Sequence, residues 1–286
     1  MSNPSDTGKK ARREHARELA RVEREAAKRR QKRNRLFLQG GIVAIVLAVA
    51  AVVVVVIASS TSVSAVSPKN MASNGILFTG DGTAVSPVAT KALEPGADPV
   101  ASDTSATDAA VNIVTYIDYA CPICQTFESA NSEQITGWVA QGAATLEIHP
   151  ISILDRVSLG TKYSSRAANA AVCVANYEPD QYLAVNDALF AGQPEENTSG
   201  LDTAALKTLV ADAGADSDEV ASCIGDKTFA DWVTAATDRV TDGELASDTV
   251  TEFVGTPTVL VNGELYQGSI SDAEAFAAFV AEVAAA

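Results

Sequence analysis

The sequence predicts an α/β domain that carries an inserted α-helical lobe and follows a single transmembrane helix. Three observations lead to this fold class. An uncharged apolar run occupies residues 40–58, strand-like and helix-like segments alternate over residues 110–150 and 254–286, and an alanine-rich helical block at about 159–245 separates those segments. Removing the block leaves the order βαβ–ββα, which describes one compact α/β unit with a lobe and not two independent domains.

The first sixty residues are organised by charge and hydropathy. Residues 1–35 contain thirteen Lys or Arg against five Asp or Glu, and we expect a basic, helical, cytoplasmic leader. The apolar run of 40–58 would span roughly 29 Å as a helix, close to the thickness of a bilayer core. We therefore predict a transmembrane anchor at 36–59, with everything after it outside the cell, because positive charge stays on the cytoplasmic side. A cleaved signal peptide is the alternative, since residues 63–65 resemble a cleavage site.

The rest of the chain is strongly acidic. Residues 36–286 hold eight basic against thirty-one acidic side chains, and the formal net charge of the whole chain is −15. Such a surface repels phosphate, so we predict no nucleic-acid partner and interpret the basic leader as a topology signal. Residues 60–109 are rich in Ser, Thr, Ala, Pro and Gly, and we expect an extracytoplasmic linker with a short strand and turn at "NGILFTGDG".

A strand–helix–strand unit is predicted at residues 110–150. The segment "VNIVTYIDY", 111–119, is almost continuously apolar, as in a strand buried on both faces. Apolar residues at helical spacing predict a helix over 121–142, and "ATLEIHPISIL" after it alternates like a second strand.

The C-terminal part of the domain is predicted from a hairpin signal. "GTPTVLVNGELYQGS" gives two strands around the turn dipeptide Asn262-Gly263, and a helix closes the chain. We place the domain at 110–286.

Two of the four cysteines, Cys121 and Cys124, are three positions apart. As a structural staple this pair would close a ring too short to stabilise the fold much. As half of a zinc site it lacks a second close pair of ligands, because Cys173, Cys223 and His149 stand apart in the sequence, so we predict no metal.

A reactive dithiol is the remaining interpretation of the pair. Cys121 follows a strand at the start of a helix, where free backbone N–H groups and the helix dipole stabilise a thiolate. Pro122 suits the first helical turn, where its missing N–H has no partner to lose. Cys124 lies one turn later, close enough to form a disulfide with Cys121.

The motifs "YIDYACPICQTFE" and "FVGTPTVLVNG", some 130 residues apart with the helical block between them, resemble the DsbA family of thioredoxin-fold thiol–disulfide oxidoreductases. The resemblance is greatest to the membrane-anchored extracytoplasmic members of Gram-positive bacteria, and it covers about 110–286. It implies a thioredoxin-like fold, catalytic Cys121 and Cys124, and no cofactor beyond their redox-active disulfide.

The resemblance also implies roles for residues outside the dithiol. The proline matching Pro257 is cis in the family, and the backbone of the preceding residue, here Thr256, pairs with the substrate chain; a trans proline opening an edge strand is the alternative. Glu128 matches an acidic position in the active-site helix, although a solvated helix charge would look the same. Many relatives carry a buried acid where this chain has Thr115. Either Asp118 or Glu128 then substitutes in proton transfer, through water, or the step is slower.

Three further positions complete the site hypothesis. Ile123 replaces the commoner His or Tyr and gives the thiolate no charge or hydrogen bond, so we do not assume a very oxidising potential. We expect Cys173 and Cys223 to form a structural disulfide worth about 4 kcal/mol on the entropic model, as in several Gram-positive relatives; two buried free thiols are the alternative. We interpret His149 as structural.

The expected function is oxidation of cysteine pairs in exported proteins, with a membrane redox partner that re-oxidises the dithiol. A reductase or isomerase would use the same residues in the opposite direction. A non-catalytic thioredoxin-fold binding module is the alternative of another class.

Overall fold

The computed structural model describes residues 65–105 and 107–286. The predicted leader at 1–35 and the predicted anchor at 36–59 lie outside these residues. Within the described ranges, no helix combines the length and apolar character needed to cross a membrane. The strands are β1 (Ile76–Gly80), β2 (Val85–Pro87), β3 (Val111–Ile117), β4 (Ala144–Pro150), β5 (Thr258–Val261) and β6 (Glu264–Leu265). The helices are α2 (Pro122–Ala140), α3 (Tyr163–Tyr177), α4 (Tyr182–Ala191), α5 (Thr203–Asp212), α6 (Asp218–Asp226), α7 (Ala230–Thr241) and α8 (Ala273–Ala284).

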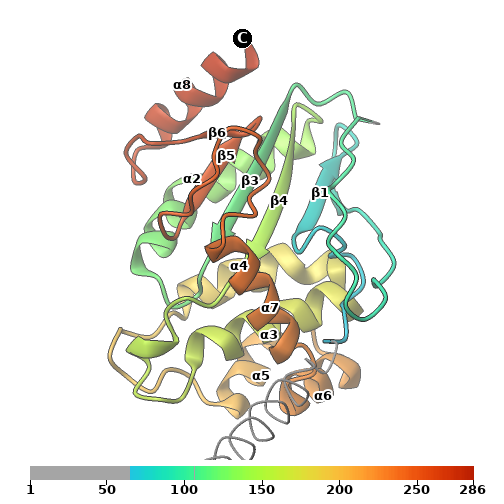
Figure 1. Cartoon of the computed structure of the whole chain (residues 1–286), viewed down its shortest axis with the longest axis vertical. Helices are drawn as coiled ribbons and strands as arrows, with labels where there is room; N and C mark the ends of the chain where they lie inside the picture. The colour runs from blue at the N-terminus through green and yellow to red at the C-terminus, as the bar shows by residue number, and fades with distance from the viewer. Residues whose placement is uncertain (1–64, 106) are drawn as a thin grey trace, which may run out of the picture. The chain divides into compact units, whose positions relative to one another are not determined.

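The strands form one sheet in the order β2-β1-β4-β3-β5-β6 (Figure 1). β3 and β4 are parallel because α2 crosses between them, and the other neighbouring strands are antiparallel. The central strand β3 is thus paired along both edges. Its residues are buried on both faces apart from the half-buried Asn112, as its continuous apolar sequence predicted.

Alternate residues of β3 enter two different cores. Ile113 lies in the larger cluster with Phe127 of α2 and Phe276 of α8, whose rings meet edge-on with centroids 5.4 Å apart. Tyr116 faces the opposite side and packs with Val240 of α7. The thioredoxin-like arrangement expected from the resemblance is therefore present, with helices on both faces of the sheet.

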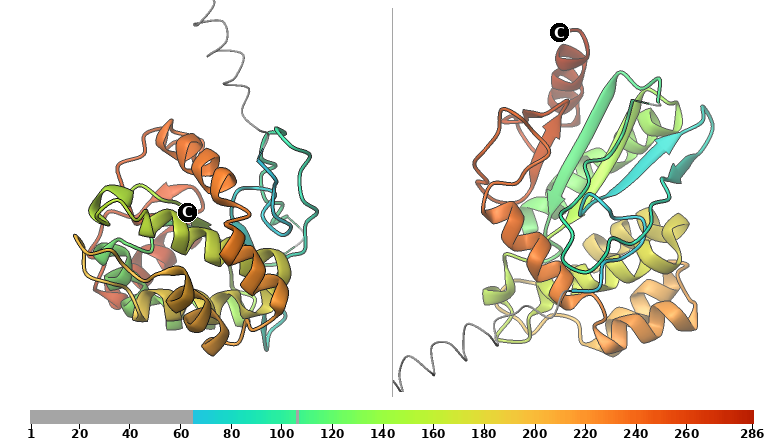
Figure 2. Two further views of the ribbon diagram at one scale, coloured as in Figure 1. Left: turned by 90° about the horizontal axis from the view of Figure 1, so that it is seen from below. Right: turned by 45° about the vertical axis from the view of Figure 1, so that its right-hand side comes forward.

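The helices α3 to α7 form a lobe at the end of the sheet where β3 and β4 finish (Figures 1 and 2). α3 is its central helix, and alanines at residues 167, 168, 170, 171 and 175 are at most 1% exposed, which lets neighbouring helices approach closely. Cys173 of α3 is bonded to Cys223 of α6, with Cα atoms 5.8 Å apart. The expected disulfide is confirmed, and the alternative of two free thiols is wrong.

The segment expected to be a linker, 60–109, instead contributes two strands to the sheet. β1 pairs with β4 over three residues, including Phe78 opposite Leu146. Ile76 and Phe78 are at most 1% exposed. The physical reason is that β4 would otherwise expose an unpaired edge beside apolar side chains. The folded unit therefore begins before residue 76 and not at 110.

The turn between β5 and β6 follows the prediction from its dipeptide. Asn262 and Gly263 both have positive φ, 48° and 82°, the backbone that a tight hairpin of this type needs. This hairpin places β5 beside β3, and so brings residue 257 to the end of the sheet that carries the dithiol.

Candidate functional site

The dithiol lies where β3 ends and α2 begins. Cys121 is the N-cap residue of α2, with extended backbone angles, and Pro122 occupies the first turn. The sulfur of Cys121 therefore occupies the position in which the side-chain oxygen of a usual N-cap residue would accept hydrogen bonds from backbone N–H groups. Both cysteines are free thiols; Cys121 is 5% exposed and Cys124 is not exposed at all. The two sulfurs are thus chemically distinct, with only one of them reachable from solvent.

The surroundings separate the acidities of the two thiols. The hydrogen bond with Cys124 is the main cause that lowers the pKa of Cys121 to about 6, helped by the Thr256 side chain and the backbone N–H groups of Cys124 and Ile123 against the effect of burial. Burial first, and then the interaction with Cys121, hold the pKa of Cys124 well above its ordinary value. At neutral pH Cys121 is a thiolate and Cys124 keeps its proton, which is the division of roles that disulfide exchange requires.

The loop before β5 faces the dithiol. The Thr256–Pro257 peptide bond is cis, so the trans alternative is wrong. The Thr256 carbonyl oxygen lies 3.3 Å from Cys121 Sγ and accepts a hydrogen bond from this sulfur while Cys121 is protonated. Gly255 has φ of 135°, a conformation that side chains disfavour, which explains a glycine before the threonine. Two sequence motifs 135 positions apart therefore meet at one sulfur.

Asp118 fastens the turn that leads into Cys121. One carboxyl oxygen accepts hydrogen bonds from Ala120 N at 2.8 Å and Ser164 Oγ at 2.6 Å, and the other accepts one from Leu154 N at 3.0 Å. The side chain is fully buried. Burial raises the pKa of Asp118, and these hydrogen bonds oppose that rise. The carboxyl group joins the active-site turn to the start of α3.

Glu128 lies one helical turn after Cys124 on α2. It is 9% exposed, so the alternative of a solvated charge is wrong. Burial first, and then the negative charge of Asp187, raise the pKa of Glu128 to about 7, while a hydrogen bond from Asn186 Nδ2 at 3.3 Å opposes this. A carboxyl group with this pKa gains or loses a proton readily near neutrality.

A family model described as thioredoxin matches residues 105–281, more than half of the chain. The chain belongs to the thioredoxin family. Among solved structures it is similar to a reduced disulfide bond oxidoreductase, DsbG, and to oxidised DsbA, both from Mycobacterium tuberculosis and both 27% identical with a TM-score of 0.55. The DsbG match covers 73% of this chain and 86% of that one, and the DsbA match covers 74% and 93%.

BdbD from Bacillus subtilis shares the fold, at 17% identity and a TM-score of 0.53 over 78% of this chain and 99% of that one. No curated protein sequence matches the chain significantly.

Thr115 and Ile123 are the two positions at which the sequence was expected to depart from the family pattern. Thr115 is 1% exposed on the face of β3 that α2 covers, and its hydroxyl has no hydrogen-bond partner among the described residues. Ile123 is 51% exposed beside Cys121 and offers the sulfur only its backbone N–H. The buried acid nearest in sequence to the dithiol on α2 is therefore Glu128.

Sequence analysis missed one contributor to the thioredoxin-family site, Gln193. Its side-chain amide donates to the carbonyl oxygens of Tyr119 at 2.9 Å and Cys121 at 3.1 Å. Gln125 of α2 makes a similar hydrogen bond from the active-site side: its side-chain amide donates to the carbonyl oxygen of Phe190, at the end of α4, at 2.6 Å. The only local signal is Pro194, a residue that interrupts helices, and it says nothing about contacts of Gln193 some 70 residues away.

His149 lies on β4 and not at the dithiol. Its Nε2 is 3.1 Å from Glu147 Oε1 without being aligned for a hydrogen bond, and the ring packs on Tyr116 with centroids 4.5 Å apart. Burial alone would raise the pKa of Glu147, but His149 and the hydroxyl of Ser73 lower it overall. This position agrees with a structural role, with an acidic partner that the sequence did not suggest.

Proposed function

We propose that this protein is a membrane-tethered thiol–disulfide oxidoreductase that oxidises cysteine pairs of exported proteins. The observation that carries the proposal is the low-pKa Cys121 at the N-terminus of α2, in contact with the cis Thr256–Pro257 loop and backed by the buried Cys124. The similarity to the M. tuberculosis oxidoreductases supports the same chemistry.

The oxidising cycle begins with the Cys121–Cys124 disulfide. A client thiolate attacks Cys121 Sγ, a client–Cys121 disulfide forms, and Cys124 leaves with the electron pair of the broken bond. A second client thiolate then attacks the client sulfur of that mixed disulfide, and Cys121 leaves as a thiolate. Two electrons pass from the client to the enzyme. The low pKa of Cys121 makes it a good leaving group and stabilises the reduced enzyme, which favours this direction.

Cys124 needs a proton when it leaves, because its pKa is well above the ordinary value. Glu128 is the better candidate for supplying it. Its carboxyl group has a single hydrogen bond, at 3.3 Å, and a pKa of about 7. Asp118 is held by three donors at 3.0 Å or less, so a proton transfer would disturb the turn before Cys121.

The client chain would lie against the loop before β5. Thr256 is half-buried, and its carbonyl oxygen already contacts Cys121 Sγ. We infer that a client pairs with the Thr256 backbone while its cysteine reaches the sulfur. The predicted anchor at 36–59 would fix the protein in the cell membrane, with the N-terminus cytoplasmic and the domain outside, where a membrane redox partner re-oxidises the dithiol.

The deciding experiment is the reduction potential of the Cys121–Cys124 pair in the purified full-length chain, equilibrated with glutathione buffers. We expect a value above about −200 mV, toward the −120 mV of strong oxidases. A value near −270 mV, as in thioredoxin, would make the protein a reductase with the same site.

Two variants separate the catalyst from a binding module. Cys124→Ser should trap the mixed disulfide between Cys121 and a client, and Cys121→Ser should abolish exchange. If glutathione cannot react with the pair and Cys121→Ser retains function in cells, the protein is a binding module and the proposal fails.

A further inference from the structure

The carboxyl group of Glu128 is held by one side chain, that of Asn186. Asn186 lies on α4 and is 2% exposed, and its Nδ2 donates to Glu128 Oε2 at 3.3 Å. Within the described part of the chain, this is the only hydrogen bond to the carboxyl group. The two carboxyl oxygens are therefore different: Oε2 faces a donor, and Oε1 is left to carry the proton.

The side-chain amide of Asn186 is oriented in turn by Tyr119. The Tyr119 hydroxyl donates to Asn186 Oδ1 at 2.9 Å. Burial holds the pKa of Tyr119 well above its ordinary value, so the phenol keeps its proton and remains a donor. An amide turned the other way would place its oxygen against the ionised carboxyl group of Glu128, with no proton between two acceptors. Tyr119 thus determines which end of the amide faces Glu128.

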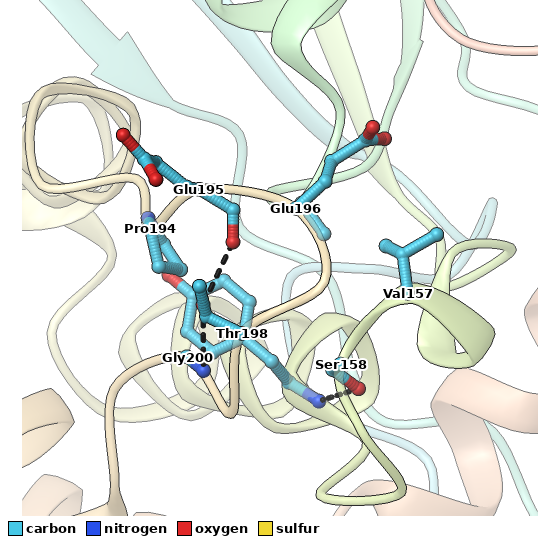
Figure 3. A pocket seen from close by; sticks show the side chains of 9 residues that line it. Val157, Ser158, Pro194, Glu195, Glu196, Thr198 and Gly200 are labelled. Atoms are coloured by element: carbon cyan, nitrogen blue, oxygen red, sulfur yellow. Dashed lines mark hydrogen bonds between the residues drawn. The ribbon is translucent and has the colours of Figure 1, made fainter.

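The helix α4 is held against both α2 and the active-site turn. Gln125 of α2 donates to Phe190 O at the end of α4. The loop after α4 begins beside Gln193, whose amide donates to the carbonyl oxygens of Tyr119 and Cys121. Figure 3 shows the next part of this loop, beside a small pocket, and two of the hydrogen bonds within it. The side chains that α4 turns toward α2 are therefore fixed relative to the dithiol.

Glu128 and Cys124 are one turn apart on α2 and are both among its buried residues. Three titratable groups outside α2 act on Glu128: the exposed Asp187 of α4 and the buried phenols of Tyr119 and Tyr182. Burial raises the pKa of both phenols, so they stay neutral, and Asp187 supplies the negative charge that disfavours the ionised form of Glu128.

We propose that Asn186 is a positioning residue for proton transfer to Cys124, because its amide engages Glu128 Oε2 and leaves the proton of that carboxyl group on Oε1. The inference rests on the proposed function, since it concerns the step in which Cys124 leaves the enzyme disulfide. When a client thiolate attacks Cys121 Sγ, the electron pair of the broken bond goes to Cys124 Sγ. The proton of Glu128 Oε1 then neutralises this sulfur, directly or through a water molecule. Glu128 becomes a carboxylate that keeps its hydrogen bond from the amide, and it regains a proton from solvent.

The test measures how fast one dithiol peptide reduces the oxidised full-length chain, for wild type and for Asn186→Leu, from about pH 5 to about pH 9. Leucine is of similar size but can neither donate nor accept a hydrogen bond. Both proteins meet the same peptide at the same pH, so the ratio of their rates cancels the ionisation of the peptide thiols. We expect the variant to be about three-fold slower below about pH 6, where Glu128 carries its proton in both proteins.

The low-pH ratio separates positioning from a change in acidity. Loss of a donor to the carboxylate should also move the break in the pH–rate profile to higher pH. A shift of that break with equal rates below about pH 6 would show that Asn186 only tunes the acidity of Glu128, and it would overturn the proposal.

A double variant tests whether Asn186 acts through the carboxyl group. In a Glu128→Gln chain, which has no such proton to position, adding Asn186→Leu should not slow the reaction further. A fall of about three-fold in both backgrounds would mean that the substitution damages the site in another way, and it would also overturn the proposal.

Tyr119→Phe provides an independent test if Asn186→Leu does not fold. It removes the hydroxyl that orients the amide and keeps the ring, which packs on Phe190 with centroids 5.0 Å apart. We expect the rate to fall about two-fold below about pH 6, and not to fall where Glu128 is already glutamine. Tyr182→Phe is the matched control. Its hydroxyl lies 3.4 Å from that of Tyr119 and, among the described residues, has no hydrogen bond to Asn186 or Glu128, so the rate should stay unchanged. Equal falls in the two tyrosine variants would contradict the orienting role.

The same measurements distinguish failure of this inference from failure of the proposed function. If the peptide does not reduce the wild-type chain, both fail. If Glu128→Gln reacts like wild type, the carboxyl group is not the proton donor, and the inference fails while the exchange chemistry stands. If Glu128→Gln is slow but Asn186→Leu and Tyr119→Phe match wild type at every pH, the positioning role alone is refuted.

Discussion

The turn before Cys121 and the helical turn after Cys124 both bury a carboxyl group, but they hold it differently. Asp118, in the first, accepts from three donors, one in its own turn and two from other parts of the chain. Glu128, in the second, has one weak donor and a neighbouring negative charge. The carboxyl group of Asp118 therefore holds the turn in place through its hydrogen bonds, whereas the carboxyl group of Glu128 is free to gain or lose a proton. The difference lies in the number of hydrogen bonds and not in burial.

Asp118→Ala should give the largest effect on stability. It would leave the N–H groups of Ala120 and Leu154 and the hydroxyl of Ser164 without their acceptor, and we expect the free energy of unfolding to fall by about 3 kcal/mol or more. Denaturant unfolding of the reduced full-length chain measures this. Asp118→Asn, which keeps one oxygen, should lose less. An Ala variant as stable as wild type would show that Asp118 is no fastening.

Glu128→Gln should change how stability depends on pH. The pKa of Glu128 in the folded chain, about 7, is above its ordinary value of 4.5. Its contribution is therefore fully present below pH 4.5 and is lost as the pH rises through 7, by up to about 3 kcal/mol. The free energy of unfolding of the Gln variant should therefore rise relative to that of wild type as the pH increases from 4.5 to 7. Denaturant unfolding at several pH values measures this. Glu133→Gln, at an exposed position on the same helix, should not show this rise.

The same Glu128→Gln variant should slow the chemistry. Without a proton donor one turn from Cys124, we expect formation of the mixed disulfide from the oxidised enzyme to slow about tenfold or more near pH 7. The break in the pH–rate profile near the pKa of Glu128 should disappear, a change that a purely structural role would not produce. A rate and profile matching those of Glu133→Gln would instead point to water as the proton donor.

Gln193→Met should have the smallest effect. Methionine has a side chain of similar length but no hydrogen-bond donor, so the carbonyl oxygens of Tyr119 and Cys121 each lose a hydrogen bond. We expect the free energy of unfolding to fall by about 1 kcal/mol. Gln125→Met removes the opposing bond to Phe190 and should behave alike. Thermal unfolding of both variants provides the comparison, and a larger loss than for Asp118→Ala would reverse the ranking of the two fastenings.

The local motifs of the site could be predicted from sequence. A few neighbouring residues are enough to identify each motif, because its chemistry is local or closely matches a family pattern. The motifs are the pair Cys121 and Cys124, the proline at 257 and the turn at 262–263. The order of strands and helices after residue 110 followed from periodicity for the same reason.

What escaped prediction depends on contacts between distant segments. The strand at 76–80 was visible, but the Ser-, Pro- and Gly-rich sequence around it indicated a linker, and only pairing with β4 shows that it completes the sheet. The environment of Glu128 requires Asn186, 58 positions away, on a helix whose packing no local pattern fixes. The pKa of a buried side chain and the pairing of an edge strand both depend on segments that meet only in the folded protein.

The disulfide inside the helical lobe has a consequence for how each copy of the protein is made. Cys173 and Cys223 are 0% and 3% exposed, so no oxidant reaches them once the lobe has closed. Their bond must therefore form while the chain is still folding. Under the proposed function, every new molecule is a client of disulfide formation before it becomes a catalyst of it.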